Sequence, residues 1–82
     1  MHHELKIQRP YYEAIIDRGK RFEIRYNDRG FKTGDTVTLC LWDQDLGGYI
    51  DKPPVHATIT YITDYQQKDG WVVFGFELQS KS

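Results

Sequence analysis

The sequence has little of what marks several protein classes. Its single cysteine, Cys40, excludes an intramolecular disulfide and a cysteine-based zinc site. The longest apolar run, residues 71–76, is far shorter than the roughly 20 residues that a membrane helix needs. No apolar stretch follows basic residues near the N-terminus, so no signal peptide is visible. We therefore expect a cytoplasmic protein that makes no membrane contact.

The chain also lacks a large net charge. It has 11 Lys and Arg against 12 Asp and Glu, a formal charge of −1, which excludes a uniformly basic nucleic-acid binder. With 82 residues it has room for one small domain and one core. Aromatic residues are abundant at 15%, which excludes an intrinsically disordered chain.

Charge is distributed unevenly along this chain. Residues 1–32 hold eight of the 11 basic residues and five acids, giving +3, and residues 33–82 carry −4. A basic first half can bind a polyanion through one face, because the local field matters more than the total charge. The alternative, which composition alone favours, is that both signs simply solvate the surface.

The residue pattern predicts five strands and one short helix in the order β-α-β-β-β-β. The strands are expected at residues 3–8, 20–26, 36–42, 55–63 and 71–78, and the helix runs from Pro10 to a C-terminal cap at Gly19. Alternation and helical spacing predict three apolar faces: Val37, Leu39 and Leu41 pointing inward, Val55, Ala57, Ile59 and Tyr61 on one side of their strand, and Tyr11, Tyr12, Ile15 and Ile16 on one side of the helix. The first crossover allows a parallel pair, and the remaining pairs are expected to be antiparallel. Because closure removes exposed sheet edges, we predict an α+β, mainly β fold: a small five-stranded mixed pseudo-barrel.

The strand at residues 20–26 alternates strictly between apolar and charged side chains. One face carries Phe22, Ile24 and Tyr26, and the other carries Arg21, Glu23 and Arg25, with Lys20 at the start. If the apolar face enters the core, the charged face lines a groove or meets solvent. A carboxylate between cations orients them and leaves donors for a phosphate or a base edge. The alternative is an exposed strand with ion pairs worth under ~1 kcal/mol each.

The spacing Lys20-x-x-Glu23-x-Arg25 after a short helix, followed by Gly34-Asp35, resembles the ASCH-domain family of the PUA-like superfamily. The resemblance is closest to a small, uncharacterised phage and bacterial branch. Its matching segments are residues 3–7, 10–14, 20–25, 27–29, 31, 34–35, 42–43 and 60–62. It covers nearly the whole chain and implies a single ASCH domain over residues 1–82.

This resemblance implies a PUA-like pseudo-barrel with a cleft between the helix and the Lys-x-x-Glu-x-Arg strand. The family's cleft is thought to hold RNA or a modified nucleoside, so RNA or a nucleotide-like ligand is the expected partner. The candidate binding residues are Lys20, Arg21, Glu23, Arg25, Arg29, Tyr26 and Trp42. The family pattern has a glycine two residues before its lysine, where this chain has Arg18.

Two alternatives to an RNA-binding module remain open. Some ASCH members resemble N4-acetylcytidine amidohydrolases or ribonucleases, and in such an enzyme Lys20 and Glu23 would be the catalytic residues. Glu23, however, stands where the amidohydrolases have a threonine, and a carboxylate beside Lys20 favours the ammonium form, which is a poor nucleophile. The second alternative is a phage or host protein-interaction domain, whose sign would be a large exposed apolar patch.

The remaining aromatic and metal-ligating residues give weaker signals. We expect Phe22, Phe74 and Phe76 in the core, while Tyr26, Phe31, Tyr49, Tyr65 and Trp42 are free to stack on bases. His2 and His3 have no third ligand within reach in the sequence. There is no glycine-rich phosphate loop. We therefore expect neither a metal nor a cofactor.

Overall fold

The computed structural model describes residues 1–79 as one mixed β-sheet with a short helix. The strands are β1 (His2–Ile7), β2 (Phe22–Tyr26), β3 (Thr36–Asp43), β4 (Gly48–Tyr49), β5 (Val55–Thr63) and β6 (Trp71–Leu78), and the helix is α1 (Tyr11–Ile16). This confirms a mainly β, α+β fold. The helix is shorter than predicted, because the chain leaves the helical path before Gly19.

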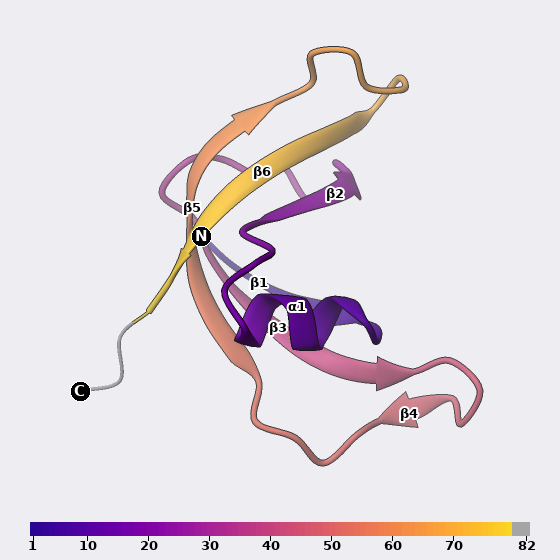
Figure 1. The fold of residues 1–82 in the computed structure, drawn as a ribbon. Coiled ribbons are helices and arrows are strands. Elements are labelled where there is room, and N and C mark those ends of the chain that lie inside the picture. The colour runs from indigo at the N-terminus through magenta and orange to yellow at the C-terminus, as the bar shows by residue number, and fades with distance from the viewer. Residues whose placement is uncertain (80–82) are drawn as a thin grey trace.

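The strands lie in the order β1-β3-β5-β6-β2, and β4 pairs only with β3. The parallel pair is β1 with β3, and all other pairs are antiparallel. The predicted parallel pair therefore exists, but it joins the first strand to the third and not to the second. The sheet is strongly curved, and α1 lies on its concave side (Figure 1).

The structure differs from a five-stranded barrel in two respects. The sixth strand, β4, arises inside the predicted loop, where Trp42 pairs with Tyr49 and Asp43 with Gly48. The Asp43 carboxylate closes this turn by accepting the backbone N–H groups of Asp45 and Leu46 at 2.8 and 3.0 Å. In addition, β1 and β2 are the two ends of the strand order, so the sheet is not closed by backbone pairing between them.

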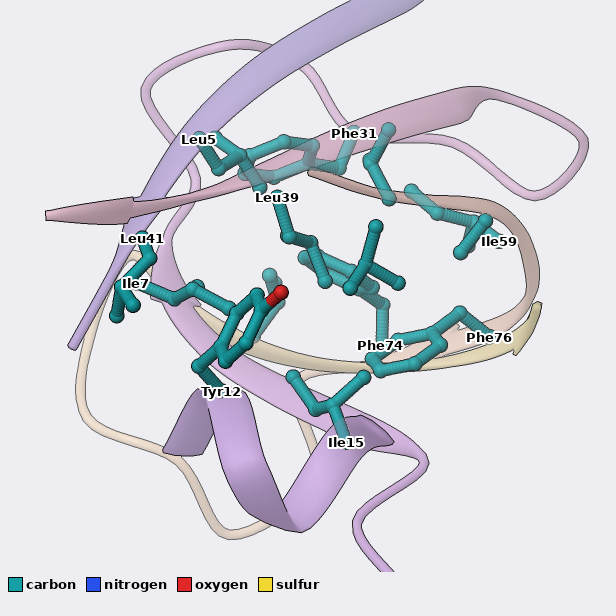
Figure 2. Packing of buried hydrophobic residues seen from close by; sticks show 14 residues of the cluster. Leu5, Ile7, Tyr12, Ile15, Phe31, Leu39, Leu41, Ile59, Phe74 and Phe76 are labelled. Carbon is teal, nitrogen blue, oxygen red and sulfur yellow. The ribbon is translucent and has the colours of Figure 1, made fainter. Parts of the chain in front are cut away.

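The core lies between the concave face of the sheet and α1. Val37, Leu39 and Leu41 of β3 point into it as predicted, and from the helix Tyr12 and Ile15 pack toward Phe74 and the other sheet residues (Figure 2). The full cluster is Leu5, Ile7, Tyr12, Ile15, Phe31, Val37, Leu39, Leu41, Val55, Ala57, Ile59, Val72, Phe74 and Phe76.

Two local predictions are wrong for reasons of backbone geometry. Tyr61 was expected on the same face as Ile59, but a register shift between these residues turns Tyr61 outward and brings Ile62 toward the core. The residue in the left-handed conformation after α1 is Arg18, with φ of 65°, and not the expected Gly19. An arginine thus occupies a conformation that favours glycine.

Strand β2 faces the opposite way from the prediction. Glu23 is only 6% exposed, whereas Phe22 and Ile24 are 44% and 51% exposed, and Tyr26 is also exposed. Phe22 is therefore not a core residue. The inversion is tolerated because Glu23 has cationic partners on both sides, so each oxygen of its buried carboxylate accepts a hydrogen bond.

The connection from β2 to β3 is anchored by Asp35. Its carboxylate contacts the Met1 ammonium at 3.1 Å and His3 Nε2 at 2.9 Å, and it accepts the Lys32 N–H at 3.1 Å. These contacts, first of all the one with His3, lower the pKa of Asp35 from 3.8 to about 2. Asp35 therefore fixes the end of this connection, next to Lys32, against the start of β1.

Candidate functional site

A cleft of about 750 Å³ lies between the two end strands, β1 and β2. Four consecutive residues of β1 and its extension line one side, and all five residues of β2 line the other. The lining residues are Leu5, Lys6, Ile7, Gln8, Tyr11, Lys20, Phe22, Glu23, Ile24, Arg25, Tyr26, Asp28, Arg29, Phe31 and Trp71. The cleft is thus the gap that an antiparallel pairing of β1 with β2 would have filled.

Glu23 lines this cleft and lies between two cations. Its Oε1 accepts a hydrogen bond from Lys20 Nζ, and its Oε2 accepts one from Arg25 Nε at 2.9 Å. The side chains of Lys20 and Arg25 are partly buried. The three residues that the sequence singled out therefore converge at one place, and the two cations hold the carboxylate by both oxygens.

Lys20 has further contacts at the helix end of the cleft. Its ammonium donates to the Phe22 carbonyl at 2.6 Å. It also lies 5.0 Å from the centre of the Phe22 ring and 5.4 Å from that of Tyr11. The lysine ammonium thus lies near two aromatic rings at this end.

Two arginines bridge the gap from the β2 side to the β1 edge. Arg25 Nη2 donates to the Lys6 carbonyl at 2.6 Å, and Arg29 Nη1 donates to the Glu4 carbonyl at 2.8 Å. Backbone groups of alternate residues point to the same side of a strand, so both carbonyls lie on the edge of β1 that faces the cleft. The guanidinium groups thus occupy acceptors that a neighbouring strand would otherwise use.

The charged side chains of the cleft have a positive balance. Four cations and two acids line it, so its formal charge is +2 although the whole chain carries −1. The cations are Lys6, Lys20, Arg25 and Arg29, and the acids are Glu23 and Asp28. A concave wall with one dominant sign concentrates an oppositely charged ligand.

Exposed aromatic rings lie at both ends of the cleft. Tyr11 and Phe22 flank Lys20 at one end, and Tyr26 meets Trp71 edge to face at the other, with ring centres 6.0 Å apart. The Tyr26 ring lies against Gly70. A Cβ atom at position 70 would be only 2.5 Å from that ring, so the close packing requires glycine there. Such rings provide faces on which nucleobases stack.

The structure brings five of the seven predicted site residues into the cleft: Lys20, Glu23, Arg25, Tyr26 and Arg29. Arg21 does not line it, because its Nε donates to the Arg18 carbonyl at 3.3 Å. Trp42 also lies outside, packed edge to face on Tyr49 at 5.0 Å. Phe31, considered for stacking, is buried against His3 and Phe74.

Sequence reasoning missed several residues that line the cleft. Lys6 of β1 lies opposite β2, with its ammonium 3.9 Å from the centre of the Trp42 ring. Tyr11 was predicted only as part of the apolar helix face, and Trp71 only as part of the last strand; both line the cleft. Lys6 was recognisable as an outward residue of an alternating strand, but only the sheet order places that strand beside β2.

Other features of the described residues offer less chemistry. A second cavity, of about 1110 Å³, lies between α1 and the segment around Pro53; Tyr12 is its one aromatic lining residue, and this ring is buried. Within residues 1–79, no group of three or more His, Cys, Asp or Glu side chains is placed to hold a metal ion. Burial raises the pKa of the Cys40 thiol, and Glu4 adds to that effect.

No helix in the described part of the chain is long and apolar enough to cross a membrane.

Comparisons with known proteins relate this chain to one bacteriophage protein and one protein family. It is 37% identical over 62 residues to a protein of Escherichia phage P2 described as "Uncharacterized 12.9 kDa protein in GpA 3'region". The aligned part is 76% of this chain and 54% of the phage protein, so the chain spans about half the length of that relative. Residues 2–76 match the family described as "Domain of unknown function (DUF3850)". The match includes both strands of the cleft and all its lining residues, and the chain belongs to the DUF3850 family.

Proposed function

We propose that this domain binds single-stranded nucleic acid, RNA in the first place, in the cleft between β1 and β2. The observation that carries the proposal is the combination of four cations with exposed aromatic rings in one concavity. Phosphates supply affinity through such cations, and stacked bases add roughly 1–3 kcal/mol each. Neither the cations alone nor the aromatic rings alone would favour nucleic acid over other ligands.

The size and lining of the cleft favour a single strand over a duplex. Its volume of about 750 Å³ lies within the range that takes one small ligand, roughly 300–1,000 Å³. Rings such as those of Tyr11 and Phe22 can contact a base face only where that face is not already stacked in a helix. The bound segment is therefore short, with its bases turned toward β2.

The resemblance to the ASCH family, and the PUA-like fold that this resemblance implies, support the same proposal. The family's glycine precedes the motif lysine by two residues, and here Arg18 has a φ of 65° at that position. A left-handed conformation explains why relatives would use glycine there. In this interpretation, the gap between β1 and β2 is the open side of a PUA-like pseudo-barrel.

Binding without catalysis fits the contacts of Lys20 better than an enzyme does. Its ammonium is engaged by the Glu23 carboxylate and by the Phe22 carbonyl. An ammonium held in this way attracts a polyanion and can donate to a ligand oxygen, but it does not serve as a nucleophile. The ribonuclease and amidohydrolase alternatives predict products from RNA or from N4-acetylcytidine, so the absence of turnover is part of the proposal.

The test is a fluorescence anisotropy titration of labelled single-stranded RNA against the protein at several salt concentrations. We expect the logarithm of the affinity to fall linearly with the logarithm of salt, with a slope of about −0.7 for each phosphate contacted. A duplex of the same length should bind more weakly. The absence of binding at low salt across several sequences would reject the proposal, and RNA cleavage in the same mixtures would replace it with the enzyme alternative.

A further inference from the structure

The hydrogen-bonding groups around Glu23 in the cleft have a definite order. The Glu23 carboxylate is an acceptor, with Lys20 on one oxygen and Arg25 on the other. The cleft therefore presents a donor, an acceptor and a donor in sequence. An ionised carboxylate has more acceptor positions than these two contacts use, so it can accept a further hydrogen from a ligand.

We propose that the cleft selects a nucleobase with an imide edge, uracil in RNA or thymine in DNA, and that Glu23 accepts its N3–H. The imide edge presents carbonyl O4, the N3–H and carbonyl O2, which is acceptor, donor and acceptor. This order complements that of Lys20, Glu23 and Arg25. The proposal rests on the proposed function, because it names the base that a bound strand places in the cleft.

The three groups are already positioned before a ligand arrives. Lys20 is fixed by the Phe22 carbonyl at 2.6 Å, and Arg25 by the Lys6 carbonyl at 2.6 Å. Both cations retain donors beyond these contacts, because an ammonium and a guanidinium each carry more N–H groups than are used here. Donors and an acceptor held in place lose little conformational entropy when a base binds.

The other bases present edges that oppose this order. Cytosine places the lone pair of N3, an acceptor, against the Glu23 carboxylate, and its amino group meets a cation. Guanine presents its N1–H and its amino group side by side, so the amino group again meets a cation. Adenine places the lone pair of N1, an acceptor, against the Glu23 carboxylate. Each mismatch leaves buried polar groups without partners, which typically lowers affinity by about 1–3 kcal/mol.

Aromatic rings lie beside this polar centre. The rings of Phe22 and Tyr11 have their centres 5.0 and 5.4 Å from the Lys20 ammonium, and both side chains are exposed. A base whose edge meets Glu23 therefore has ring faces within reach of its own faces. The site thus offers stacking and edge recognition to the same base.

The first experiment compares short single-stranded homopolymers of uridine, cytidine and adenosine, together with a uridine oligomer that carries 3-methyluracil. We expect the uridine oligomer to bind about tenfold more tightly than the others, including the methylated one, in which the N3–H is missing. A thymidine oligomer, compared in parallel, distinguishes DNA from RNA as the source of the imide edge.

The second experiment uses Glu23→Gln, with Glu77→Gln as the charge-matched control. Glu77 is exposed on β6 and does not line the cleft. Glu23→Gln should weaken the preference for uridine over cytidine, because an amide can donate to cytosine N3 as readily as it accepts from uracil, whereas the repulsion between the cytosine amino group and a cation remains. The control should keep the preference. Far-UV circular dichroism identifies a variant that fails to fold, and the methylated oligomer then still tests the proposal with the unaltered protein.

The outcomes separate this inference from the proposed function. Equal affinity for uridine, cytidine and 3-methyluridine oligomers would overturn the imide assignment and leave the nucleic-acid site intact. The absence of binding to every oligomer would overturn both. A uridine preference that is undiminished in Glu23→Gln would also overturn the assignment, because the N3–H would then not be recognised by Glu23.

Discussion

Strands β3 and β2 bury opposite kinds of side chain. β3 lies between β1 and β5 and buries Leu39 completely, along with its apolar neighbours on the same face. β2 lies at the end of the sheet, buries the charged Glu23 and leaves Ile24 half exposed. The comparison shows that the centre of the sheet supplies stability, while its open end holds groups that are arranged for contact with a ligand.

The largest effect that separates the two strands is expected on stability. Leu39→Ala should lower the free energy of unfolding by about 2–5 kcal/mol, because it leaves a cavity in a fully packed core. Ile24→Ala should lower the same quantity by a smaller amount, about 1 kcal/mol or less, because half of its surface is already in water. Urea unfolding followed by circular dichroism measures both. Similar losses in the two variants would contradict the division between the strands.

The next effect is expected on ligand binding and is confined to β2 and its flank. Lys20→Ala and Arg25→Ala should each weaken binding of single-stranded RNA about tenfold and make the salt slope less steep, because each removes a cation from the cleft. Arg21→Ala is the matched control, since Arg21 is adjacent in sequence but lies outside the cleft. If Arg21→Ala weakened binding as much as Lys20→Ala, a general basic surface would replace the cleft as the site.

A third effect is expected on the pH dependence of stability through Asp35. Its pKa in the folded protein is about 2, below the ordinary value of 3.8. A lowered pKa means that the stabilisation is present above pH 3.8 and is lost as the pH falls through the window down to about 2. Acid titration of the unfolding free energy should therefore show a decline in this window.

Asp35→Asn should remove this part of the decline and leave RNA binding at neutral pH nearly unchanged, because Asp35 contacts β1 and its own loop, outside the cleft. An unaltered acid profile in the variant would show that other carboxylates cause the decline. A large loss of RNA binding would show that the loop anchor and the cleft are not separate.

The smallest effect is expected at the end of α1, just before Lys20. Arg18→Gly should raise the free energy of unfolding by about 0.5 kcal/mol, because glycine adopts a φ of 65° without the strain that arginine has there. Gly19→Ala is the control and should be tolerated, since a methyl group there would come no closer than 3.8 Å to the Ala14 carbonyl oxygen. A strong loss of stability in Gly19→Ala would mean that Gly19 is the residue needing the unusual conformation.

The sequence was sufficient for what local patterns decide. Alternation identified the core face of β3, and the spacing of Lys20, Glu23 and Arg25 identified a charged cluster that the structure brings together. Both depend on residues close in the chain, where strand and helix geometry fix the direction of each side chain. The same holds for the strand positions, which lie close to the predicted ranges.

The sequence was not sufficient for what depends on distant contacts. Alternation in β2 is sharper than in β3, yet β2 faces the other way, because alternation does not say which face meets the core. The bridge from Arg25 to the Lys6 carbonyl joins residues 19 positions apart, and no local pattern predicts it. The open gap between β1 and β2 follows from the order of the strands in the sheet. That order depends on pairing between strands far apart in the chain, so local sequence patterns do not predict it.

The central claim is that a single-stranded nucleic acid binds between β1 and β2, and nuclear magnetic resonance tests it most directly. Single-stranded RNA is titrated into isotope-labelled protein, and the backbone amide resonances are followed residue by residue. We predict that the largest shifts occur at Lys6, Glu23 and Ile24 in the cleft, while His56 beside the second cavity stays nearly unchanged. Shifts centred on the second cavity, or no shifts at low salt, would contradict the account.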